Sequence, residues 1–124
     1  IHVRHNATLK QALLSTGFPY DRATSPVNNY QNFMNFKREV QAVRRLGAAA
    51  LDLSFVACGR FDGYWELKIQ PHDIAAGMLI VREAGGMASD FSGNADVPTI
   101  FPRRQIVASN GLIHAEMLRV LGQN

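Results

Sequence analysis

Two carboxylates, Glu66 and Asp73, stand seven residues apart in positions that suit different chemistry. Asp73 follows Pro71 and precedes the nearly unbroken apolar run "IAAGMLIV". Proline there predicts the start of a helix, where an acid can accept backbone N–H bonds and meets the positive end of the helix dipole. A carboxylate held at such a point can also bind Mg²⁺, which prefers several hard oxygen ligands. A helix cap and a metal ligand are both compatible with this position.

Glu66 follows Tyr64 and Trp65 in the stretch "DGYWELK". A charged side chain among aromatic residues needs solvent or a polar partner, because burying an unpaired charge is costly. Glu66 is therefore either an outward-facing strand residue or a carboxylate that accepts hydrogen bonds from the hydroxyl groups of a polyol substrate. The residue pattern alone leaves both interpretations open.

Three further features near these acids also have ordinary structural explanations. The segment "LGAAALD", residues 46–52, would let another group approach the backbone closely, but small residues also pack in helix cores. We expect Asp52 to cap a helix or to pair with an arginine, and His72 to be a packed residue, a hydrogen-bond donor or a ligand. "EAGG", residues 83–86, predicts a helix end, since it lacks the Lys and the Ser or Thr of a phosphate-binding loop.

Helices and strands are predicted to alternate along the chain, which favours one layered α/β domain. Apolar spacing and glycine or proline breaks set the boundaries, and the apolar helix after Asp73 is expected to be buried between layers. We expect helices over 6–15, 28–47, 48–59, 72–86 and 111–122 and strands over 61–69, 87–91 and 104–110. Residues 1–4 are expected to form or end a strand, residues 15–22 to form a loop or strand end, and residues 92–103 to form a loop.

The composition is that of a globular domain with 124 residues and a net charge of +3. No apolar run reaches the roughly 18 residues of a membrane span, and no signal peptide is visible. The single cysteine, Cys58, lies in the apolar run "LSFVACG" and is predicted to be a buried, reduced thiol, which fits a cytoplasmic setting. Because the chain begins without Met, we expect a processed or partial chain.

Basic residues cluster in "KREVQAVRR", residues 37–45. On a helix these charges would face solvent around apolar Val40 and Val43. A nucleic-acid surface would want aromatic or polar base-reading groups beside them, and none is clearly placed. A solvated helix face is therefore the favoured interpretation, and a nucleic-acid partner is not expected.

The order of these segments resembles the C-terminal half of the inositol monophosphatase family. The resemblance rests on "LGAAALDLSFVACGRFDGYWELKIQPHDIAAGMLIVREAGGMASDFSG" and "IVASN", and "LLSTGFPYDR" looks like the bacterial members. It implies that residues 1–124 form the C-terminal domain of the five-layer αβαβα sugar-phosphatase fold, supplying its αβα part with a mixed sheet. Family members hydrolyse phosphate monoesters with Mg²⁺, and many are lithium-sensitive dimers.

The resemblance also implies roles for three residues. The acid that matches Asp73 is a metal ligand shared with acids of the N-terminal half, the acid that matches Glu66 contacts inositol hydroxyls, and the small residue that matches Ala49 contacts substrate. His72 stands where the family usually has Trp. The family's Asp-Pro-x-Asp-Gly-Thr run and its upstream glutamates are absent, so no catalytic residue is assigned in this chain, and we expect it to be inactive alone.

The expected function belongs to the complete protein. It is Mg²⁺-dependent hydrolysis of inositol 1-phosphate, in a cytoplasmic enzyme that forms a homodimer and has no membrane association. One alternative is another substrate, such as fructose 1,6-bisphosphate, a nucleotide phosphate or histidinol phosphate. A second is a non-catalytic role in binding RNA or a transcription partner, since some bacterial relatives bind transcription machinery. A third is a structural half without activity.

Overall fold

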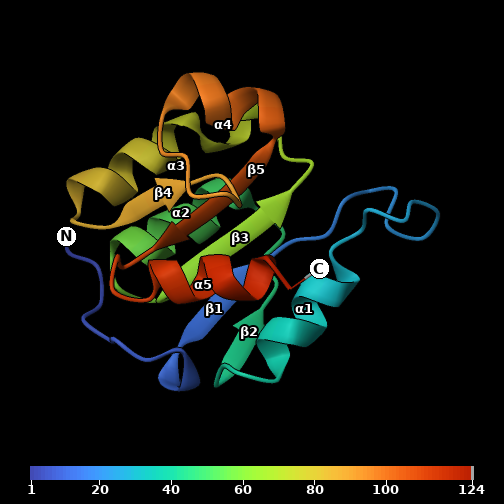
Figure 1. The fold of residues 1–124 in the computed structure, drawn as a ribbon. Helices are drawn as coiled ribbons and strands as arrows, with labels where there is room; N and C mark the ends of the chain where they lie inside the picture. The colour runs from blue at the N-terminus through green and yellow to red at the C-terminus, as the bar shows by residue number, and fades with distance from the viewer. Residues whose placement is uncertain (124) are drawn as a thin grey trace.

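The computed structural model describes residues 1–123 and contains one mixed five-stranded sheet with helices on both faces (Figure 1). The strand order is β2-β1-β3-β5-β4; β1 runs parallel to β2 and β3, and β5 runs antiparallel to β3 and β4. The strands are β1 Leu13–Thr16, β2 Ala42–Arg44, β3 Gly63–Leu67, β4 Met87–Ser89 and β5 Gln105–Ser109. The helices are the 3₁₀ turn η1 Leu9–Gln11, α1 Tyr30–Lys37, α2 Ala49–Ala57, α3 Pro71–Glu83, α4 Val97–Arg103 and α5 His114–Leu121.

The sheet separates two hydrophobic clusters, which confirms the expected αβα layering. On one face, residues of α2, α3 and α4 pack on Tyr64 and Ile106. On the other face, residues of α1 and α5 pack on Trp65 and Val107. Neighbouring strand residues enter opposite clusters because side chains alternate across a sheet. Glu66, two residues after Tyr64, therefore points to the face that carries α2 and α3.

Helices α2 and α3 lie against each other because a glycine lets them approach. A Cβ atom at Gly77 would lie 2.5 Å from Cδ1 of Leu53, closer than real Cβ contacts allow. Leu53, Ile74, Met78 and Val81 are fully or almost fully buried in the same cluster. This packing holds the starts of the two helices at one edge of the sheet.

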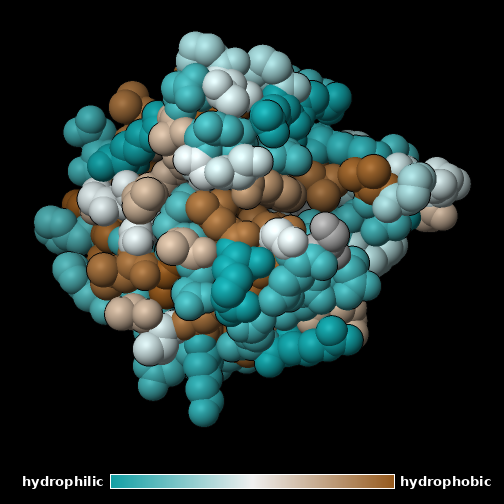
Figure 2. Space-filling model, in the orientation of Figure 1, coloured by the Kyte–Doolittle hydropathy of each residue, from teal (hydrophilic) through white to brown (hydrophobic). Residues whose placement is uncertain are grey.

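Within the described residues α3 is buried on one side only, and its burial between two layers stays a prediction for the complete protein. The helix buries one side, but Leu79 is 60% exposed and Ile80 is 39% exposed, and Leu51 of neighbouring α2 is 43% exposed. The outer surface of the α2–α3 layer is therefore apolar and open. The opposite face of the molecule differs: Figure 2 shows mainly hydrophilic residues over α5 and α1, with hydrophobic surface above α5.

The expected helix over residues 28–47 is wrong in its second half. Helix α1 ends at Lys37, and the chain turns and enters β2. Val43 pairs with Leu14 of β1 and is buried. The segment therefore forms a strand although its apolar residues have helical spacing, because tertiary pairing outweighs the local preference. The basic residues 37–45 do not form one helix face.

Other expectations near the ends of elements are also corrected. Residues 1–4 form no strand, although the Val3 amide donates to the Ala84 carbonyl at 3.2 Å. The helix over 6–15 is reduced to η1, because its second half enters β1, and the loop over 92–103 contains α4, whose Ile100 is fully buried. Cys58 is exposed rather than buried.

The remaining helices and strands are confirmed within a few residues of their predicted ends. These are α2, α3 and α5 and the strands β3, β4 and β5. Within residues 1–123, no helix is long and apolar enough to cross a membrane.

Candidate substrate and metal site

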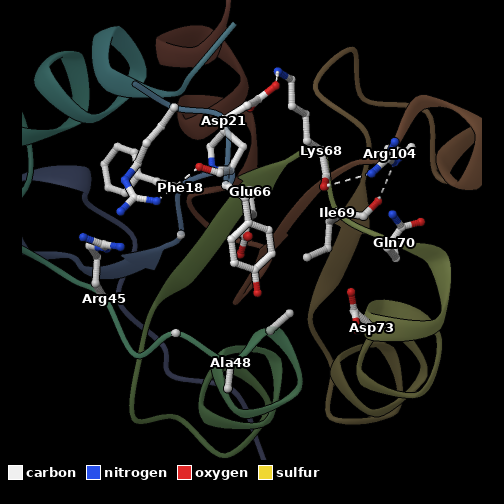
Figure 3. Close-up of a pocket in the computed structure, with 16 residues that line it drawn as sticks. Phe18, Asp21, Arg45, Ala48, Glu66, Lys68, Ile69, Gln70, Asp73 and Arg104 are labelled. Carbon is white, nitrogen blue, oxygen red and sulfur yellow. Dashed lines mark hydrogen bonds and ion pairs between the residues drawn. The ribbon is translucent and has the colours of Figure 1, made fainter. Parts of the chain in front are cut away.

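A cavity of about 970 Å³ lies where the ends of β1 and β3 meet the starts of α2 and α3. Parallel strands β1 and β3 end at the same edge of the sheet, and both helices begin there. Glu66, Ala49 and Asp73, the residues expected at the site, all line this one cavity. In Figure 3, Glu66 lies between Arg45 on one side and Asp73 on the other.

Asp73 lies in the first turn of α3 but does not cap the helix with its side chain. The N-cap residue is Gln70, no side-chain cap hydrogen bond is present, and the Asp73 amide donates to the Gln70 carbonyl at 3.0 Å. Within residues 1–123, the carboxylate has one ionic neighbour, His72, with Nε2 3.4 Å from Oδ1. Both side chains are exposed, at 43% for Asp73 and 79% for His72. The Asp73 carboxylate is therefore open to a ligand, and His72 is not a packed residue.

Glu66 is half-buried and lines the cavity, so it is not an outward-facing strand residue. The Tyr64 hydroxyl donates a hydrogen bond of 2.5 Å to Oε1 of Glu66. Burial raises the pKa of Glu66, as does the charge of Asp73, while the Tyr64 hydrogen bond and the charge of Arg45 lower it. The carboxylate has one bound oxygen, and Oε2 has no hydrogen-bond partner among the described residues.

Ala49 begins α2 and is half-buried at the cavity wall beside Gly47 and Ala48. Gly47 has a φ of +81°, a conformation that side chains rarely adopt, and a Cβ atom added there would meet no atom within 4 Å. The small residues thus leave open space in front of the start of α2. The positive end of this helix and that of α3 both face the cavity, which favours an anionic ligand.

Asp52 is a buried carboxyl behind this wall, with 1% exposure. It makes no ion pair with an arginine among residues 1–123, and its Oδ1 and the Oγ of Ser15 are buried without a hydrogen-bond partner there. Burial raises the pKa of Asp52 to about 7, the nearby Ser15 hydroxyl opposes this, and the charge of Glu66 adds to it. The expected pairing with an arginine is therefore wrong, and Oδ1 of Asp52 has no hydrogen-bond partner among residues 1–123.

The cavity is also lined by cationic groups that the sequence interpretation did not assign to the site: Arg22, Arg45, Lys68 and Arg104. Lys68 binds Asp21 at 2.8 Å, and the Arg104 guanidinium donates to the Ile69 and Lys68 carbonyls (Figure 3). These residues come from separate loops. The sequence singled out Arg22 within "LLSTGFPYDR" and Arg45 within the basic cluster 37–45, but it placed neither at this site.

The donor set fits a metal in part. Asp73 offers an exposed carboxylate of the kind that Mg²⁺ prefers. Among residues 1–123, however, no group of three or more His, Cys, Asp or Glu side chains is placed to hold a metal ion. The described residues by themselves therefore do not form a complete metal site.

Comparisons with known proteins agree with this geometry. The chain is 48% identical over 121 residues to an inositol-1-monophosphatase of Synechocystis, covering 98% of this chain and 41% of that protein. It is 42% identical over 112 residues to the Nus factor SuhB of Pseudomonas aeruginosa, covering 89% of this chain and 40% of that protein. The structure of inositol monophosphatase from Anabaena matches with a TM-score of 0.93 and 44% identity, covering 99% of this chain and 48% of that one.

The chain therefore spans less than half the length of these relatives. The profile described as "Inositol monophosphatase family" matches residues 1–124. With the family profile, the fold and the relatives in agreement, the chain belongs to the inositol monophosphatase family.

Proposed function

We propose that these residues form the substrate-orienting part of a Mg²⁺-dependent phosphatase that hydrolyses inositol 1-phosphate. The observation that carries the proposal is the placement of Glu66 and Asp73, from two different elements, in one cavity beside the helix starts. The family membership supports a phosphoric monoester as the substrate.

Each residue has a distinct role in this proposal. Glu66 accepts a hydrogen bond from a ring hydroxyl, and the small side chain of Ala49 leaves room for the ring against the start of α2. Asp73 supplies one carboxylate ligand, and the remaining ligands come from outside these residues. When bound, Mg²⁺ would lower the pKa of a water molecule and stabilise the charge on the phosphoryl and leaving oxygens.

The complete protein would also cover the open apolar surface formed by Leu51, Leu79 and Ile80. A second layered half packed there would bury these side chains and would bring further carboxylates towards Asp73, as the five-layer arrangement requires. Cytoplasmic location, lithium sensitivity and a homodimer are part of the same proposal.

The test is a substrate panel on the complete protein, with and without Mg²⁺. Inositol 1-phosphate, fructose 1,6-bisphosphate, histidinol phosphate and a nucleoside monophosphate would be compared by kcat/KM. The proposal requires metal-dependent turnover with inositol 1-phosphate preferred. A preference for another phosphate ester would change the substrate but keep the enzyme class, and absence of metal-dependent turnover would remove both.

A second candidate function is binding to RNA or to a transcription partner, which the name of the Pseudomonas relative, Nus factor SuhB, favours. In this chain the basic residues 37–45 are split between the end of α1, a turn and β2, so they would contact a partner as a surface loop region. Salt-sensitive RNA binding that persists in Asp73→Asn would support this function. If Asp73→Asn loses RNA binding together with Mg²⁺ binding, RNA binding is not a function independent of the metal site.

A further inference from the structure

Gly17 lies directly against the carboxylate of Glu66. A Cβ atom at Gly17 would lie 2.6 Å from Oε1, 2.7 Å from Cδ and 2.8 Å from Oε2 of that carboxylate. Gly17 is not in the left-handed region of φ, so its backbone conformation is open to other residues. The position needs glycine because of the space that Glu66 occupies.

The backbone of Gly17 has little freedom to move away. Its carbonyl accepts a hydrogen bond of 2.7 Å from Nδ2 of Asn29, and Oδ1 of Asn29 accepts one of 2.7 Å from the indole of Trp65. Trp65 precedes Glu66 in β3 and is fully buried. The same short network therefore fixes both Gly17 and the strand that carries Glu66, so an added methyl group would have to displace the carboxylate.

Tyr64 holds the carboxylate from the sheet. Its ring is fully buried in the cluster under α2 and α3, and its hydroxyl donates to Oε1. Tyr64 and Glu66 are two residues apart in β3 and so lie on one face. With Oε1 held by Tyr64, Oε2 is the oxygen that has no partner within the described part of the chain.

We propose that Gly17 and Tyr64 are positioning residues that fix the Glu66 carboxylate so that Oε2 accepts a ring hydroxyl, and that they thereby set selectivity for polyol phosphates over phosphate esters without hydroxyls. This inference rests on the proposed function of the cavity and names the residues that determine its selectivity. Neither residue needs to touch the substrate, because both act through Glu66.

The test compares Gly17→Ala and Tyr64→Phe in the complete protein on two substrates, inositol 1-phosphate and p-nitrophenyl phosphate. Losing a hydrogen bond to a charged group predicts a fall in kcat/KM for inositol 1-phosphate of about ten- to a hundredfold in Gly17→Ala, mainly through KM. Tyr64→Phe should lower kcat/KM for inositol 1-phosphate less, by about three- to tenfold, because Gly17 still leaves the space that the Glu66 carboxylate occupies. Turnover of p-nitrophenyl phosphate should change less than twofold, roughly the effect expected where no contact is lost.

Two matched variants serve as controls. Gly122→Ala adds a methyl group at a glycine whose nearest neighbour would be the Leu118 carbonyl oxygen at 3.4 Å. Tyr30→Phe removes a hydroxyl from a ring that is 48% exposed and does not line the cavity. Both should leave selectivity unchanged. The double variant Gly17→Ala/Glu66→Asp should have nearly the same kcat/KM as Glu66→Asp alone, because the shorter side chain no longer meets the added methyl group.

Several outcomes would overturn the inference. Equal losses on both substrates with a lowered melting temperature would make Gly17 and Tyr64 merely structural, and unchanged kinetics in both variants would remove their role. If Gly17→Ala does not fold, Tyr64→Phe alone decides. The variant Glu66→Gln separates the role of Glu66 from the positioning role of Gly17 and Tyr64. If turnover of inositol 1-phosphate is unchanged in Glu66→Gln, the proposed function of Glu66 fails. If Glu66→Gln impairs that turnover and the Gly17 and Tyr64 variants do not, only the positioning inference fails.

Discussion

Two clusters of buried polar residues lie at opposite ends of β3, and they differ in how well their hydrogen bonds are satisfied. The cavity end, near Leu67, holds Glu66 and Asp52, whose pKa values are raised by burial. The other end pairs Gly63 with Ser109, and there Ser109 belongs to a closed network around His114. The contrast separates the region where we propose that a ligand binds from a region whose hydrogen bonds are satisfied within the fold.

His114 has a determined hydrogen-bond pattern. The Ser89 hydroxyl donates to the Asp90 carbonyl, so Nε2 of His114 must donate to Ser89 at 2.8 Å. Nδ1 then accepts from the Ser109 hydroxyl at 2.8 Å, while the Gly111 amide donates to the oxygen of Ser109. Every atom of the neutral ring that can form a hydrogen bond does so. Protonation would add a second donor facing the Ser109 hydroxyl.

Asp52 lacks such a network. Its effect on the pH dependence of stability can be separated from that of His114 by mutation. Its pKa is about 7 in the folded protein and 3.8 in its ordinary state, so the folded protein keeps the proton to a higher pH and stability falls as pH rises between these values. Asp52→Asn should remove this loss, raising the free energy of unfolding above pH 7 by on the order of 4 kcal/mol and leaving it similar near pH 4. Chemical denaturation across pH measures the difference. An equal effect at both pH values would contradict the interpretation.

His114 should show the opposite slope. Its pKa is lowered by burial from 6.5 to about 4, so the unfolded chain takes up the proton first as pH falls. The stability that depends on the neutral ring is fully present above pH 6.5 and is lost as pH falls through the folded pKa, with a total on the order of 3 kcal/mol. His114→Gln should be less stable at neutral pH but should lose this slope. An unchanged acid slope in the variant would assign it to another group.

A third prediction concerns the packing that holds both helix starts at the cavity. Gly77→Ala places a methyl group 2.5 Å from Leu53 and should lower the free energy of unfolding by about 1–3 kcal/mol, the usual cost of overpacking a core. Gly122→Ala is the matched control and should be nearly neutral, because the added Cβ would make only an ordinary contact, 3.4 Å from the Leu118 carbonyl oxygen. Thermal melts of the two variants decide this, and equal stability of both would mean that α2 and α3 adjust freely.

The sequence predicted the elements that carry the candidate site better than the elements around them. Pro71 and the apolar run after Asp73 predict α3, and the aromatic and apolar residues around Glu66 predict β3, because local signals and the final packing agree there. The segment 37–45 shows the reverse: Val40 and Val43 have helical spacing, but pairing with β1 selects a strand for residues 42–44.

The cavity itself required the three-dimensional structure. No spacing in the sequence indicates that Gly17 touches Glu66 or that Oδ1 of Asp52 is buried without a hydrogen-bond partner among residues 1–123, since these environments bring distant segments together. The spacing of Tyr64 and Glu66 places both on one face of a strand, but it does not show that they form a hydrogen bond. The exposure of Cys58 and of Leu79 was missed for a similar reason. An apolar run indicates burial, but it does not indicate whether the covering layer belongs to the same segment of chain.

The most direct test of the central claim, that this cavity is one side of a metal-dependent phosphatase site, is Asp73→Asn in the complete protein. Asn keeps the shape of the side chain and loses the charge, and no cap hydrogen bond is lost because none is present. The account predicts that Mg²⁺-dependent kcat/KM falls by at least about a hundredfold, as expected when a metal ligand is removed, while the melting temperature hardly changes. Asp52→Asn is the control and should cost far less activity. Near-normal Mg²⁺-dependent activity in a folded Asp73→Asn protein would contradict the account.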